Sequence, residues 1–132
     1  MQLALMTAVS IHLLAGVFWA GTSFAVARTG GLGGERLFAP QIIAALLAVL
    51  SGAYLWKALH EGSFGPMERI LGLGAVSAIF ALLVQLALIR PALRALRESA
   101  AHDARRRLMA GNRAVAALLA LAALAMAAAR YA

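Results

Sequence analysis

The first 27 residues of the chain carry no charged side chain, and this run constrains the fold more than any other feature. A helix rises about 1.5 Å per residue, so about 20 apolar residues cross the roughly 30 Å hydrocarbon core of a bilayer. The run therefore predicts a transmembrane helix over residues 3–27, ending at Arg28. It exceeds the apolar region of a cleaved signal peptide and no basic side chain precedes it, so we expect it to stay in the protein as an anchor.

The rest of the chain has the composition of an integral membrane protein. Of its residues 64% are hydrophobic and 13% charged, and the mean hydropathy is +0.87. Three further spans are predicted over residues 37–56, 70–89 and 114–129, with Pro40 in the first turn of the second span. The predicted fold is all-α: a single-domain integral membrane four-helix bundle over residues 1–132, with both termini on the same side. The absence of cysteine excludes disulfides and cysteine-ligated metal.

Charge predicts the topology of these spans. The first and third connections hold nine of the twelve lysines and arginines: Arg28, Arg36, Arg90, Arg94, Arg97, Arg105, Arg106, Arg107 and Arg113. The positive-inside rule places these connections in the cytoplasm, so both termini face outward across a bacterial inner membrane. Residues 91–112 are predicted to form a cytoplasmic helical loop at or rising from the membrane surface, with a break at Gly111. Because the basic residues follow topology, the net charge of +7 does not indicate nucleic-acid binding.

His12 is the functional candidate of the first span, because ionisable residues inside a membrane are rare and commonly functional. Steps of four and three residues from His12 reach Gly16, Trp19, Ser23 and Val26, which share one helix face. In lipid such a face normally packs against other helices, since glycine permits close approach and polar groups need partners. For the same reason Gln85, the strongly polar side chain of the third span, needs a hydrogen-bond partner.

Two interpretations of His12 remain open from the residues. The first is a hydrogen bond to a neighbouring helix, which would orient the bundle without a cofactor. The second is axial ligation of haem iron, with Gly16 leaving room for a flat macrocycle. The second ligand would be His60, His12 of a symmetry mate across a two-fold interface, or none. His60, near Glu61, is otherwise an ordinary polar loop residue, and we assign no function to His102.

Two motifs carry a resemblance to a known family. His12 is followed after seven residues by Trp19, then by Ala20-Gly21 and a closing Arg28, and Pro40 is followed after twelve residues by Gly52. This pattern resembles the small membrane proteins of the HemJ and CopD-like group. The resemblance implies a four-helix inner-membrane bundle, with protoporphyrinogen oxidation and haem b in the HemJ branch and copper handling in the CopD branch.

Carried over to this chain, the resemblance makes His12 the candidate haem ligand, with Trp19 and Gly21 as its packing context. The HemJ pattern has a lysine shortly before the histidine, where this chain has Val9 and Ser10. It also has a Lys-Leu motif in the third helix, where this chain has only Arg69-Ile70. The oxidase activity depends on a pattern whose lysines are missing here, whereas haem ligation depends on the histidine alone.

The sequence thus supports two hypotheses of different classes. The first is a membrane protein that binds haem b through His12, Gly16, Trp19 and Gly21, with His60 as a weaker metal ligand, for electron transfer or porphyrin oxidation. The second is a cofactor-free accessory or assembly subunit of a larger membrane complex. Both have the lipid bilayer as a partner, and both predict a homo-oligomer or a subunit of a membrane complex.

Overall fold

The computed structural model of the chain describes residues 1–60, 62, 64–98 and 101–132, and this part contains helices and no strand. Its elements are α1 (Gln2–Arg28), α2 (Gly34–Leu59), α3 (Pro66–Val84), η1 (Gln85–Ile89), α4 (Arg90–Arg97) and α5 (Ala101–Ala129). Because α3, η1 and α4 run on as one helix, the described residues form four helices long and apolar enough to cross a membrane. The predicted all-α class is confirmed. The four long apolar helices are those of a multi-pass membrane protein.

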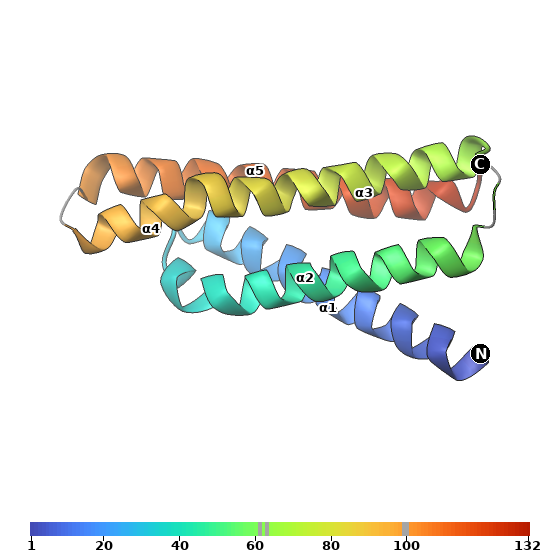
Figure 1. Cartoon of the computed structure of the whole chain (residues 1–132). Helices are drawn as coiled ribbons and strands as arrows, with labels where there is room; N and C mark the ends of the chain where they lie inside the picture. Colours follow the sequence, from blue (N-terminus) through green and yellow to red (C-terminus); the bar gives the residue numbers. More distant parts are fainter. Residues whose placement is uncertain (61, 63, 99–100) are drawn as a thin grey trace.

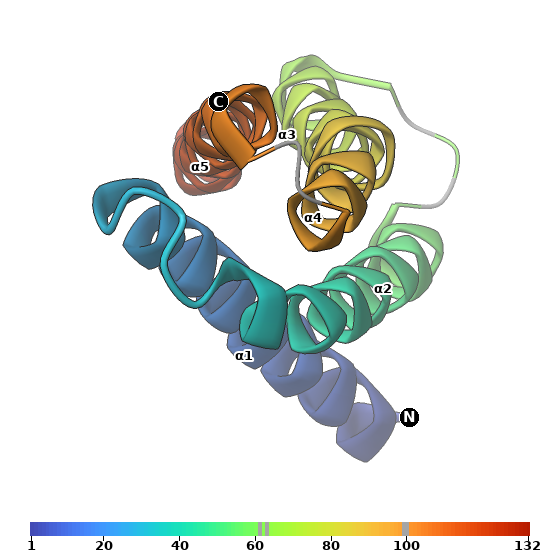
Figure 2. The same ribbon diagram turned by 90° about the vertical axis from the view of Figure 1, so that its left-hand side faces the viewer.

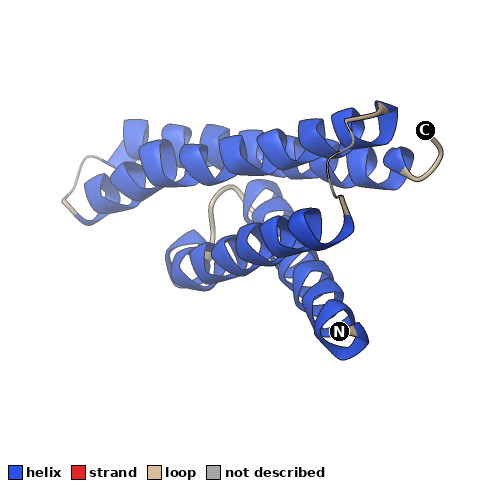
Figure 3. Cartoon of the chain, turned by 45° about the vertical axis from the view of Figure 1, so that its right-hand side comes forward, coloured by secondary structure: helices blue, strands red, loops and turns tan. Residues whose placement is uncertain are grey.

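The helices form two antiparallel pairs rather than a closed bundle. In Figure 1, α3 and α4 lie alongside α5, while α1 pairs with α2. The pairs meet mainly where the second half of α1 packs on α5, and the first half of α1 diverges from α5, as Figures 2 and 3 show. Both chain ends lie at the same end of the molecule (Figure 1). Side chains between the two pairs therefore have fewer neighbours toward the N-terminus of α1.

Small residues make the helix contacts, and large apolar residues cover the outside. The buried set contains Ala44, Ala45, Ala48 and Ala81, which allow helix backbones to approach closely. Large apolar side chains on all four long helices are exposed, among them Leu14, Leu50, Phe80 and Leu124. A surface of this kind is stable in lipid but not in water.

Two predicted boundaries differ from the structure. The second helix begins at Gly34 rather than near residue 37, because Gly33 takes a left-handed conformation (φ 78°) that starts the helix early. Pro40 therefore lies in the second turn and not in the first. Gly111 does not break a helix, since α5 runs through it. A Cβ atom there would lie 2.8 Å from Cγ1 of Ile89, so the glycine permits close packing instead.

The third predicted span also continues past its expected exit. Pro91 lacks an amide hydrogen and its ring crowds the preceding turn. The π-helical turn η1 directly before it is wider, and there the amide of Arg90 bonds the carbonyl of Gln85. This wider turn gives the proline ring room, so the helix continues to Arg97. Residues 91–112 are thus mostly the ends of two long helices, which extend beyond the connection between α1 and α2 (Figure 1).

Candidate functional site

His12 lies half-buried between α1 and α2. Its Nδ1 atom is 2.8 Å from the carbonyl oxygen of Ala48 and 3.2 Å from Oγ of Ser51. A carbonyl oxygen can only accept, so Nδ1 carries the proton and donates it to Ala48. In the neutral imidazole Nε2 is then the atom with the lone pair, and no hydrogen-bond partner is found for it among the residues that the structure describes.

The other residues predicted beside His12 separate into two groups. Gly16 is half-buried with open space around it, because a Cβ atom there would meet nothing within 4 Å. Trp19 is buried on the same face, with Ser23 and Val26 below it. Gly21 is exposed and lies about half a turn around the helix from His12. The structure therefore brings Gly16 and Trp19 to the His12 face and places Gly21 on the opposite one.

His60 is the residue directly after the C-terminal end of α2. Its ring stacks on Trp56, with centroids 5.1 Å apart, and neither ring nitrogen has a hydrogen-bond partner among the described residues. It follows Gly52, which lies against the His12 ring, by eight residues, or roughly 12 Å of helix. A metal takes nitrogen ligands at about 2 Å, so His12 and His60 of one chain do not share a metal here. Glu61 lies outside the described residues, and His102 is exposed.

A buried polar network lies one to three turns further along α1. Nε1 of Trp19 donates to Oε1 of Gln85 at 2.8 Å, and Nε2 of Gln85 donates to Oε1 of Gln41 at 2.9 Å. Nε2 of Gln41 donates to Thr22 at 3.1 Å, and the Thr22 hydroxyl donates to the Phe18 carbonyl at 2.7 Å. The donors all run in one direction, so each bond polarises the next. The expected partner of Gln85 is thus found on two helices at once.

Two buried amide side chains were not predicted from the sequence. Gln41 is 2% exposed and links α2 to η1. Asn112 is 1% exposed, and its Nδ2 donates to the Leu108 carbonyl within α5. Gln41 could have been found from the sequence. It is the amide side chain of the second predicted span, just as Gln85 is the amide side chain of the third. Two amides in facing spans satisfy one another with less cost than either alone.

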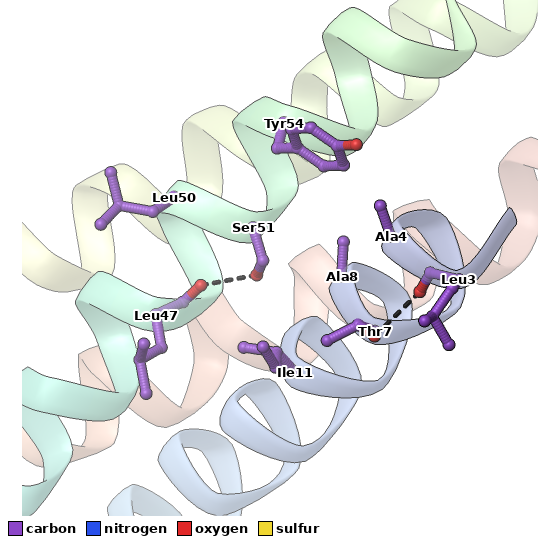
Figure 4. Close-up of a pocket in the computed structure, with 9 residues that line it drawn as sticks. All are labelled: Leu3, Ala4, Thr7, Ala8, Ile11, Leu47, Leu50, Ser51 and Tyr54. Carbon is purple, nitrogen blue, oxygen red and sulfur yellow. Dashed lines mark hydrogen bonds between the residues drawn. The ribbon is translucent and has the colours of Figure 1, made fainter. Parts of the chain in front are cut away.

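Two apolar grooves follow the outer side of the α1–α2 contact. The larger, of about 590 Å³, lies between the N-terminal half of α1 and the second half of α2 (Figure 4). The hydroxyls of Thr7 and Ser51 are satisfied within their own helices, since Thr7 donates to the Leu3 carbonyl and Ser51 donates to the Leu47 carbonyl. The second, of about 460 Å³, shares Ile11 and Leu47 with the first. His12 is not among the residues that line either groove.

His12 is a single imidazole at the contact of α1 with α2 and belongs to no cluster of metal ligands among the described residues. Within residues 1–60, 62, 64–98 and 101–132, no group of three or more histidine, aspartate or glutamate side chains could hold a metal ion. The chain matches no protein-family model, no curated protein and no solved structure. Its described part is an all-helical structure with four helices long and apolar enough to cross a membrane.

Proposed function

We propose that this protein binds a b-type haem through Nε2 of His12 and serves electron transfer in a bacterial inner membrane. The hydrogen bond from Nδ1 of His12 to the Ala48 carbonyl carries the proposal. A bond of this kind fixes the ring and its tautomer in histidines that ligate metals, and it leaves Nε2 as the ligand.

The residues around His12 fit a haem better than a bare ion. An isolated metal ion needs several protein ligands, which the described residues do not gather. A macrocycle supplies the equatorial ligands itself, so one histidine suffices on the protein side. The open space beside Gly16, one turn from His12, suits a flat group. When bound, the haem would supply one-electron redox chemistry, while this chain would hold the iron and keep water away.

The second axial ligand of the iron would decide whether the site needs a second copy of the chain. His60 of the same chain lies too far along α2, roughly 12 Å from the His12 level. His12 of a second copy across a two-fold interface would complete a bis-histidine site, so the proposal includes a homo-oligomer. The proposed topology places both termini outside, because nine of twelve basic residues lie in the first and third connections.

The test is the visible spectrum of protein purified gently from its native membrane, oxidised and then reduced with dithionite. A Soret band that scales with protein and shifts on reduction supports the proposal. His12→Ala should lose this band while the protein still inserts, and His102→Ala, which changes an exposed residue, should keep it. A wild-type preparation free of extractable haem contradicts the proposal.

A second function is favoured by a different observation. On the α1 side, the lining of the larger groove includes two small residues, Ala4 and Ala8, one turn apart (Figure 4). Small residues at this spacing permit close helix contact in lipid. The alternative is therefore a cofactor-free accessory or assembly subunit that docks onto a larger membrane complex. Co-purification of a colourless protein with stoichiometric membrane partners after mild solubilisation would support it.

A further inference from the structure

Gly52 lies directly against the ring of His12. A Cβ atom built on Gly52 would be 3.0 Å from Cε1 of the ring, 3.3 Å from Nδ1 and 4.0 Å from Nε2. The two nearer distances are shorter than ordinary van der Waals contact, so the ring occupies space that any other residue at position 52 would fill. The edge of the ring with Nδ1 and Cε1 faces α2, and Nε2 is the most distant of the three atoms.

The acceptors of the Nδ1 proton come from the turn just before Gly52. The Ala48 carbonyl, at 2.8 Å, belongs to the residue four positions earlier, and Ser51 Oγ is 3.2 Å away. The Ser51 hydroxyl donates its own proton to the Leu47 carbonyl, so it offers a lone pair to Nδ1. A side chain four residues after a helix carbonyl normally lies close to it, and here that residue is Gly52, which has no side chain.

We propose that Gly52 is the positioning residue of His12. Because it lacks a side chain, the ring reaches the Ala48 carbonyl, and this contact selects the tautomer with the proton on Nδ1. In the neutral ring Nε2 then keeps the lone pair, and of the three ring atoms near Gly52 it is the most distant. The assignment of Nε2 to haem iron rests on the proposed function, whereas the selection of the tautomer does not.

The primary test is a nitrogen-15 NMR measurement on haem-free protein in lipid nanodiscs. A His60→Gln/His102→Gln background leaves His12 as the only imidazole of the chain. Protein with Gly52 should show a protonated Nδ1 and a bare Nε2. Gly52→Val should lose at least half of the Nδ1-protonated signal, because its side chain displaces the ring. Gly72→Ala, where a Cβ meets nothing within 4 Å, is the matched glycine control and should leave the spectrum unchanged.

Two results with the parent protein and Gly52→Val overturn the inference. One is a parent spectrum with the proton on Nε2, which decides the question even if Gly52→Val fails to insert. The other is a Gly52→Val protein that inserts and keeps the parent spectrum. Ser51→Ala adds no volume and retains the Ala48 carbonyl, so it should keep the tautomer. Loss of the tautomer in Ser51→Ala would assign the positioning to the hydroxyl and contradict the role of Gly52.

A haem titration separates this inference from the proposed function. Loss of the groups that orient a metal-ligating histidine typically lowers affinity 10- to 100-fold, so Gly52→Val should bind haem more weakly by roughly that factor. If the parent binds no haem but shows the Nδ1-protonated tautomer, the proposed function fails and the positioning role stands. If the parent binds haem and Gly52→Val binds it equally well, the positioning role fails alone.

Discussion

The indole of Trp19 donates a hydrogen bond of 2.8 Å to the side-chain oxygen of Gln85, linking α1 to the π-helical turn of the third long helix. Trp19 is 1% exposed and Gln85 is fully buried, so neither polar group has water as an alternative partner. An unpaired buried donor or acceptor costs about 1–3 kcal/mol. The pair therefore fixes the register between two helices that make few other contacts.

The first prediction concerns this network. Gln85→Met keeps the volume of the side chain but leaves the Trp19 N–H and the Gln41 Oε1 atom without their hydrogen-bond partner. We expect the free energy of unfolding to fall by about 1–3 kcal/mol. The measurement is an SDS titration of the protein in mixed micelles, followed by circular dichroism.

Its control is Thr7→Val, since the Thr7 hydroxyl bonds only the Leu3 carbonyl of its own exposed helix turn. This variant should change stability by less than about 0.5 kcal/mol. The Trp19→Phe/Gln85→Met double variant should lose less than the sum of the single losses, because the bond can be removed only once. Strict additivity of the two changes would show that the bond contributes nothing.

The second prediction concerns Gly111. An alanine Cβ there would lie 2.8 Å from Cγ1 of Ile89, so Gly111→Ala should destabilise the α5 contact with η1 by about 1–3 kcal/mol. Combining it with Ile89→Ala should cost less than the two changes added. Gly72→Ala, which meets open space inside a helix, should instead be neutral or stabilising by about 0.5–1 kcal/mol. Equal effects of the two glycine changes would mean that helix propensity and not packing decides.

The sequence predicted the features that depend on one segment of the chain alone. The apolar runs predicted the helices, and the spacing from His12 placed Trp19 and Ser23 on a face that is buried. Gly111 was misassigned because glycine favours both helix ends and close packing, and only the approach of Ile89 distinguishes the two. The contact between His12 and Gly52 depends on how α1 crosses α2, which no single segment encodes. Gly21 is a different case: its place in the site came from the resemblance, whereas helix periodicity alone puts it on the face opposite His12.

The third prediction tests the topology. The chain contains no cysteine, so single-cysteine variants report one position each without further changes. Phe64→Cys and Tyr131→Cys, at residues 70% and 84% exposed, should react with a membrane-impermeant maleimide added to intact spheroplasts. His102→Cys, on the basic side, should react only after the membrane is opened. The reverse labelling pattern would place the arginine-rich ends of α4 and α5 on the outer side of the membrane.

The fourth prediction concerns Ser23, which is fully buried beneath Trp19 on the His12 face. Its hydroxyl oxygen has no hydrogen-bond partner among the residues that the structure describes. A buried polar group without a partner destabilises the folded state, so Ser23→Ala should leave stability unchanged or raise it by about 1 kcal/mol. Thr22→Val is the matched comparison, because the Thr22 hydroxyl accepts from Gln41 and donates to Phe18, and its removal should destabilise the protein. If Ser23→Ala proves as destabilising as Thr22→Val, the Ser23 hydroxyl has a partner in the membrane, such as a bound water.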